Sequence, residues 1–182
     1  MNRIVFCFLL SLVCFTACKK KHEISVKEIK EKVNKINSKL NDYTKEQVED
    51  LTSKEGGDIT GYKRDEETKK IYAQRFGTDS RTFTEYYFDD GMLIYILKQE
   101  YIYNRPNNYT EEIAKAKGDS VWYDDKKTKL KVSRFFFNDN IMIKWVNSDG
   151  VDMPVNTPEF LDKQSSMWAE TIILMKQLKE RD

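Results

Sequence analysis

The strongest hairpin pattern of apolar residues along the chain lies between Thr82 and Tyr103. Two strand-like runs there flank Asp90-Gly91, a dipeptide that accepts the positive φ angles of a type I′ turn, and this pattern predicts a β-hairpin. The predicted cross-strand pairs are Asp89 with Met92, Phe88 with Leu93, Tyr87 with Ile94, and Tyr86 with Tyr95. Both faces of this hairpin are apolar, which indicates that both are buried or that one serves as a binding surface.

The same pattern returns at Ser133–Val146, with Asp139-Asn140 at the turn. Residues 82–97 and 131–146 align at a constant offset of 49 residues, whereas residues 57–62 echo residues 118–123 only faintly. Two related hairpins indicate either a continuous antiparallel meander or two similar sheet halves. The pairs predicted for the second hairpin are Phe137 with Met142, Phe136 with Ile143, and Arg134 with Trp145. The predicted inward face, with Lys144 on the face opposite, comprises Tyr87, Ile94, Ile96, Phe136, Ile143 and Trp145.

Amphipathic helices are predicted at both ends of the folded region. Ser25 and Glu28 have the spacing of a capping box. The apolar stripe behind it, which favours packing on the protein's own sheet over a coiled-coil partner, is Val26, Ile29, Val33, Ile36, Leu40 and Tyr43. A second helix is predicted to begin with Thr157 as N-cap and Pro158 at the first helical position. Its predicted apolar stripe is Leu161, Trp168, Ile172, Met175 and Leu178.

Shorter elements are predicted between the two helices. Strands are expected at Ile59–Lys63, Lys69–Phe76 and Val121–Tyr123, and a short helix at Thr110–Lys117. Tyr43–Ser53 reads as either a short helix or a polar edge strand, and the sheet-like residues that follow favour the strand. Together these elements predict an α+β fold: an N-terminal amphipathic helix, an antiparallel meander sheet with two related hairpins, and a C-terminal helix packed on the sheet.

The start of the chain has the pattern of a targeting segment. Arg3 is followed by an apolar run at Ile4–Val13, which is too short for a comfortable membrane span. We therefore expect a signal peptide at residues 1–17, a tether at residues 18–24 and a single folded domain at residues 25–182.

Phe15-Thr16-Ala17-Cys18 resembles the lipobox of bacterial lipoproteins, in which apolar and small residues precede an invariant cysteine. The resemblance implies that Cys18 is fatty-acylated and becomes the first residue of the mature protein, where more than one acyl chain gives stable anchoring. An ordinary cleaved signal with an accidental cysteine is the alternative. In such lipoproteins a lysine after the cysteine is compatible with outer-membrane sorting, so Lys19 implies a place on the periplasmic side of the outer membrane.

A larger resemblance combines this lipobox with Gly-Gly-Asp-Ile-Thr-Gly-Tyr at residues 56–62 and Glu-Tyr-Tyr-Phe-Asp-Asp-Gly-Met-Leu-Ile at residues 85–94. These stretches resemble a class of uncharacterised Gram-negative envelope lipoproteins whose mature domains carry a Tyr-Tyr-Phe-x-x-Gly-x-Leu-Ile hairpin once or twice. The resemblance covers most of residues 24–146. It implies a cellular location and an architecture, but no activity. The second copy departs from the pattern at Asn140, where glycine is usual; asparagine tolerates the left-handed conformation, so the turn is expected to survive.

Composition limits the chemistry of the domain. Cys7 and Cys14 lie in the leader and Cys18 at its end, so the predicted domain has no cysteine and depends on packing for its stability. The one histidine of the sequence, His22, lies in the tether, which excludes a Ser-His-Asp, Cys-His or usual zinc site in the domain. The 31 basic and 30 acidic residues are nearly balanced, so the net charge does not indicate a nucleic-acid-binding protein.

Two kinds of residue remain as candidates for a site. Acidic residues occur at Asp89-Asp90, Asp124-Asp125 and Asp139, in predicted turns where aspartate is favoured for backbone reasons. Aromatic residues are frequent in the predicted strands, where rings either line a binding surface or fill the core. The candidate ligand-binding residues are Tyr86, Tyr95, Tyr101, Tyr103 and Trp122.

The sequence therefore favours a lipid-anchored, non-catalytic binding or interaction module of the cell envelope. The alternative is an envelope hydrolase or isomerase that uses acidic residues. The expected partners are the membrane, through Cys18, and a protein or a glycan. No nucleic acid, metal or cofactor is expected.

Overall fold

The computed structural model describes residues 24–180, so the predicted signal peptide, the predicted lipid attachment site and most of the predicted tether lie outside the described residues. A seven-stranded antiparallel sheet forms the centre of the described fold, and its strands neighbour one another in chain order. This confirms the predicted α+β class and the continuous meander. The strands are β1 (Thr44–Glu49), β2 (Gly57–Arg64), β3 (Glu67–Phe76), β4 (Ser80–Asp89), β5 (Met92–Ile102), β6 (Lys129–Asn138) and β7 (Ile141–Val146).

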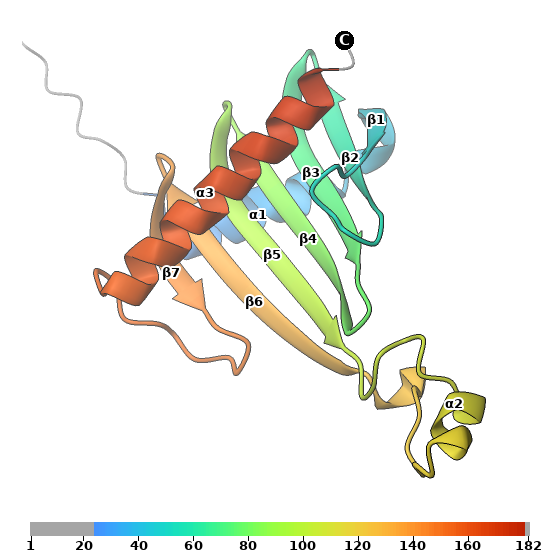
Figure 1. Ribbon diagram of the computed structural model, residues 1–182. Coiled ribbons are helices and arrows are strands. Elements are labelled where there is room, and N and C mark those ends of the chain that lie inside the picture. The colour runs from blue at the N-terminus through green and yellow to red at the C-terminus, as the bar shows by residue number, and fades with distance from the viewer. Residues whose placement is uncertain (1–23, 181–182) are drawn as a thin grey trace, which may run out of the picture.

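Two helices lie on opposite faces of the sheet (Figure 1). α3 (Pro158–Lys179) crosses one face diagonally, from β7 near its N-terminus to β1 and β2 near its C-terminus. α1 (Val26–Asn37) lies on the other face, against β4 and β5. None of the helices among residues 24–180 combines the length and the apolar character needed to span a bilayer.

The larger core lies between α3 and the sheet. The buried residues on the helix are Phe160, Met167, Thr171, Leu174 and Leu178. The predicted stripe is confirmed in part: Leu178 is buried, and Trp168 and Met175 are partly buried and pack against this core. Leu161 and Ile172, by contrast, are 46% and 59% exposed. The difference arises at Thr171, whose hydroxyl donates a 2.7 Å hydrogen bond to the Met167 carbonyl oxygen and can then be buried like an apolar group.

The smaller core lies between α1 and the opposite face of the sheet. Ser25 and Glu28 form the predicted capping box at the start of the helix. α1 ends at Asn37, earlier than its apolar stripe, and the 3₁₀ turn η1 (Leu40–Asp42) carries the stripe on to Tyr43. The core contains Ile29, Val33, Ile36, Tyr43, Tyr87, Ile94, Tyr95 and Phe136. The stripe therefore packs on the protein's own sheet, as favoured.

The predicted N-cap of α3, the edge strand and the two hairpin turns are also present. Thr157 caps α3, where its side-chain oxygen accepts a 3.3 Å hydrogen bond from the Phe160 amide. β1 occupies one edge of the sheet, which decides the ambiguous segment Tyr43–Ser53 in favour of the edge strand. The Asp90-Gly91 and Asp139-Asn140 turns have positive φ angles at both residues, as type I′ turns require.

Each predicted hairpin contains a β-bulge that the alternation did not reveal. The pairs next to the turns are as predicted, but one extra residue follows them on the second strand, Ile94 in one hairpin and Ile143 in the other. The register beyond the bulge is therefore shifted by one residue. The observed pairs there are Tyr87 with Tyr95, Tyr86 with Ile96, Phe136 with Lys144, Phe135 with Trp145, and Arg134 with Val146.

The bulges move residues to the opposite face of the sheet from the one predicted. Ile96 and Trp145, expected to face inward with Ile94, lie in the α3 core instead. Tyr95 lies in the α1 core. Lys144 is on the α1 side as well, where its ammonium nitrogen is 2.7 Å from a carboxylate oxygen of Asp152. The repeat at an offset of 49 residues is confirmed down to the position of the bulge.

β2 and β3 form a third hairpin of the same geometry. Asp65 and Glu66 have positive φ angles at its turn, and Lys69 is the extra residue after the second pair. An offset of 25 residues superimposes this hairpin on the β4–β5 hairpin, so Lys69 occupies the place of Ile94. The sequence conceals this copy because polar residues stand where the other two copies have apolar ones.

Residues 103–128 leave the sheet between β5 and β6 and form a separate loop region (Figure 1). The predicted helix is present as α2 (Glu111–Ala116), capped by Thr110. The predicted strand Val121–Tyr123 is wrong, because β5 and β6 pair directly with each other and leave it no strand partner. Its backbone instead bonds within the loop, with the Tyr123 amide 2.9 Å from the Tyr109 carbonyl oxygen. The faint echo of residues 57–62 at 118–123 therefore has no structural counterpart.

Candidate functional site

α1 covers only part of its face of the sheet. Its contacts on the sheet lie near the tips of the β4–β5 and β6–β7 hairpins. Farther along β3, β4 and β5, side chains on the same face belong to neither of the two buried cores. We call this surface the open aromatic face and define it by Tyr72, Phe76, Arg81, Phe83 and Tyr101.

The rings of the open aromatic face contact one another from strand to strand. Phe83 lies at the centre, with its ring centroid 6.2 Å from that of Tyr72, 6.4 Å from that of Phe76 and 5.4 Å from that of Tyr101. Phe76 is 42% exposed, and the other three rings are partly exposed. Tilted and edge-on contacts of this kind stabilise ring clusters, so the rings form an ordered apolar patch that reaches solvent.

Polar groups accompany these rings. The guanidinium carbon of Arg81 lies 5.0 Å from the ring centroid of Tyr101 and 5.8 Å from that of Tyr103. Burial raises the pKa of the Tyr72 phenol, and the negative charge of Glu85 raises it further, so the hydroxyl stays protonated. The face therefore combines flat apolar surfaces with a neutral hydroxyl and with a guanidinium that is paired with Asp125 at 3.2 Å.

The structure separates the five residues that the sequence singled out. Tyr86 is fully buried in the α3 core, and Tyr95 is 9% exposed in the α1 core, so neither is available to a ligand. Tyr101 belongs to the open aromatic face, and Tyr103 lies at its end, beneath Arg81. Trp122 is 36% exposed in the loop region, outside the sheet.

Sequence reasoning missed Phe76, Phe83 and Arg81 as members of the face. Arg81, Phe83 and Tyr87 are separated by even numbers of residues along β4, so their side chains lie on the same face of the sheet. This spacing could have identified Arg81 and Phe83 from the sequence. What the sequence does not reveal is the register of β3 against β4, which places Tyr72 opposite Glu85 and so brings three strands of rings together.

A buried polar cluster separates the open aromatic face from α1. Lys70 is only 7% exposed. Its ammonium nitrogen lies 2.8 Å from Glu85 Oε2 and 3.2 Å from Asn37 Oδ1. The Tyr87 hydroxyl donates its proton to Glu85 and lies 3.1 Å from the same amide oxygen. Burial raises the pKa of Tyr87, and its bond to Glu85 adds to the effect. Every charge here is compensated, so the cluster fixes the end of α1 to the sheet.

A second buried cluster joins two carboxylates through Arg75. Asp50 has no exposed side-chain surface, and its Oδ2 lies 2.5 Å from Arg75 Nε, while Glu170 binds the other end of the guanidinium. Burial by itself would raise the pKa of Asp50, but hydrogen bonds from Thr52 and Arg75 outweigh it and lower the pKa. This arrangement ties β1, β3 and α3 together and leaves no free carboxyl group.

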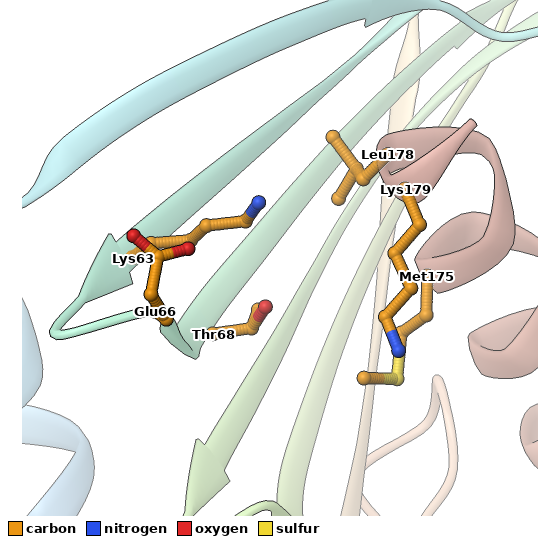
Figure 2. Close-up of a pocket in the computed structure, with 6 residues that line it drawn as sticks. All are labelled: Lys63, Glu66, Thr68, Met175, Leu178 and Lys179. Atoms are coloured by element: carbon orange, nitrogen blue, oxygen red, sulfur yellow. The ribbon is translucent and has the colours of Figure 1, made fainter. Parts of the chain in front are cut away.

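A cavity of about 360 Å³ lies between the β2–β3 hairpin and the end of α3. Figure 2 shows the hairpin residues on one side of this cavity and the helix residues on the other: Lys63, Glu66 and Thr68 opposite Met175, Leu178 and Lys179. The two lysines are matched by Glu66 and by Glu46, which lies 2.6 Å from the Lys63 nitrogen. With balanced charge and no ring surface, this cavity is a weaker candidate than the open aromatic face.

Within residues 24–180, no group of three or more His, Cys, Asp and Glu side chains could hold a metal ion. Comparison with known proteins adds no relative: no protein-family model matches the chain, and no curated protein or solved structure matches it.

Proposed function

We propose that the folded domain is a non-catalytic binding module and that its ligand is a glycan held on the open aromatic face. The observation that carries this proposal is the contact of Phe83 with three rings from neighbouring strands at a partly exposed sheet face. Sugar rings stack on aromatic rings and need hydrogen-bond partners at their edges. Tyr72 and Arg81 supply such partners beside the rings.

The alternative, a hydrolase or isomerase that uses acidic residues, has less support. A general acid at neutral pH needs a carboxyl group whose pKa is raised. Among the described residues, the acidic groups with a shifted pKa all have it lowered: Asp50, Glu67, Glu112 and Asp119. Hydrogen bonds from cations, hydroxyls or backbone amides hold these groups in the ionised form, which favours a structural role for them.

Replacing Phe76 and Tyr101 together with alanine is expected to weaken glycan binding by about tenfold or more, because each ring contributes roughly 1 kcal/mol or more of stacking. The measurement is a screen of residues 19–182, which contain the whole described fold, against polysaccharides of the bacterial envelope, followed by titration of the glycans that bind. Both residues are at least partly exposed, so the variant should fold.

Ile172→Ala is the matched control, because this residue is 59% exposed on α3, on the other side of the sheet. Equal affinity of the double variant and the control would contradict the proposal. Capture of an envelope protein through the same rings, with no glycan bound, would replace the glycan by a protein as the ligand class.

The cellular location of the protein is part of the same proposal. We place it at the periplasmic side of the outer membrane, held by acyl chains on Cys18, which lies outside the described residues. α1 begins at Val26, so a tether of only a few residues would separate the folded domain from the lipid. The support for this location is the lipobox pattern and the apolar leader.

The variant Cys18→Ser is expected to abolish incorporation of a labelled fatty acid and to release the protein from the membrane fraction. The measurement is metabolic labelling of the full chain in a Gram-negative host, followed by fractionation. Cys14→Ser is the control and should keep the label, because that residue lies inside the predicted signal peptide. A wild-type chain without label would refute the lipid anchor and leave the binding face untouched.

A further inference from the structure

A second surface, beside the C-terminal half of α1, concentrates positive charge in a concave site. A cavity of about 320 Å³ opens between α1, the η1 turn and the tips of two hairpins. Of its eight lining residues, one is acidic, and five are basic: Lys32, Lys35, Lys39, Arg64 and Lys69. We call this surface the basic pocket. The whole chain has a net charge of +1, so this local excess is a feature of the fold and not of the composition.

The basic pocket keeps unneutralised charge after its ion pairs are taken into account. Lys32 binds Asp89, and Lys69 lies 2.7 Å from Glu67. Within the described part of the chain, the ion-pair partner of Arg64 is the exposed Asp65, at 3.4 Å. Lys35 and Lys39 make no ion pair with any residue in the described part of the chain. Their positive charges therefore remain available to an anionic ligand.

The three hairpins provide an internal comparison for Lys69. This lysine occupies the bulge position, where the two other hairpins have Ile94 and Ile143 on the α1 side of the sheet. In both of those copies the residue packs with the α1 core. The copy that lines the basic pocket has a cation instead, and departures of this kind from the local pattern are expected at functional sites.

We propose that the basic pocket binds a phosphoryl group. A phosphate carries up to two charges and several acceptor oxygens, so it can pair with several of the cations that line this pocket, whereas a single carboxylate carries only one charge. Arg64 offers a planar, two-pronged donor for such an anion. Ile36 and Tyr43 supply an apolar wall for the group that carries the phosphate. This site is separate from the open aromatic face and does not depend on the function proposed for that face.

The test is a calorimetric titration of residues 19–182 with pyrophosphate, in parallel with sedimentation of the protein on phosphatidylcholine vesicles with and without one-third phosphatidylglycerol. We expect saturable binding to pyrophosphate, or to the anionic vesicles alone if the phosphate is a lipid headgroup. The double variant Lys35→Gln/Lys39→Gln should weaken that binding by about tenfold or more, because two charge-assisted contacts are lost.

The matched control is Lys126→Gln/Lys127→Gln, which removes two lysines from the loop region at η2 (Asp125–Lys127) and should leave binding unchanged. Lys35 is exposed and Lys39 is partly exposed, and neither forms an ion pair within the described residues, so unchanged thermal unfolding should show that the test variant folds. Three results would overturn the proposal: no binding to either probe, equal binding by the test and control variants, or equally tight binding of a triglutamate peptide.

Discussion

Replacing Arg75 with methionine is expected to lower the free energy of unfolding by about 3 kcal/mol. Asp50, which has no exposed side-chain surface, would lose its cation and keep a buried, uncompensated charge. Glu170 would lose the same partner on α3. Arg75 is 26% exposed, which places the effect at the lower end of what breaking a buried pair costs. Chemical denaturation at neutral pH measures the difference.

The effect should depend on pH in a direction that the structure fixes. The pKa of Asp50 is lower in the folded protein than its ordinary value of 3.8, so its ionised form contributes stability above that value. This contribution is lost as the pH falls through the folded pKa. The difference between wild type and Arg75→Met should therefore shrink below about pH 4, because the carboxyl group becomes neutral in both proteins.

Arg105→Met is the control for this network. Arg105 pairs with Asp119 at 2.9 Å in the loop region, and its side chain is 42% exposed. Exposed pairs contribute at most about 1 kcal/mol, so this variant should be close to wild type. Equal losses for the two arginines would show that the buried network does not stabilise the fold in the way described.

Replacing Gly57 with alanine is expected to destabilise the protein by about 3 kcal/mol or to prevent folding. A Cβ atom at this position would lie 2.3 Å from the backbone oxygen of Gln74 on β3. Because the obstacle is backbone in a paired strand, it cannot move aside without breaking the β2–β3 pairing. Thermal and chemical unfolding of the variant, or its yield as soluble protein, measure the effect.

Gly61→Ala is the matched control on the same strand. The Cβ added there would lie 3.1 Å from Leu178 Cδ1, a flexible side-chain end that can shift by a few tenths of an ångström. Its cost should stay near or below 1 kcal/mol. Equal stability of Gly57→Ala and Gly61→Ala would contradict the close approach of Gly57 to the Gln74 backbone oxygen.

The case of Gly57 shows how a correct local interpretation can miss the tertiary reason for a residue. The sequence marks Gly56-Gly57 as a break between strands, and the positive φ of Gly56 agrees with that. The need for glycine at position 57 comes instead from a backbone that arrives from β3. No local pattern carries that information, because the contact joins residues from different strands.

The candidate site likewise depends on tertiary contacts that no local sequence pattern reveals. Tyr101 was recognisable from the sequence as a strand aromatic, but so were Tyr86 and Tyr95, which are buried. The difference depends on which part of the sheet each helix covers. α1 packs near the tips of the hairpins, against Ile94 and Phe136, and this position leaves the rings around Phe83 outside the α1 core.

Short-range patterns in the sequence were sufficient for the α+β class, the helix caps, the two type I′ turns and the order of the elements, except for the strand expected at Val121–Tyr123, which is absent. All of these depend on short-range chemistry: periodicity, capping side chains, and residues that tolerate positive φ. The tertiary structure alone decided the faces beyond the bulges, the burial of Thr171 and the places of the open aromatic face and the basic pocket. One inserted residue reverses the side of every residue after it in a strand, and only packing of the whole sheet against its helices fixes where that residue goes.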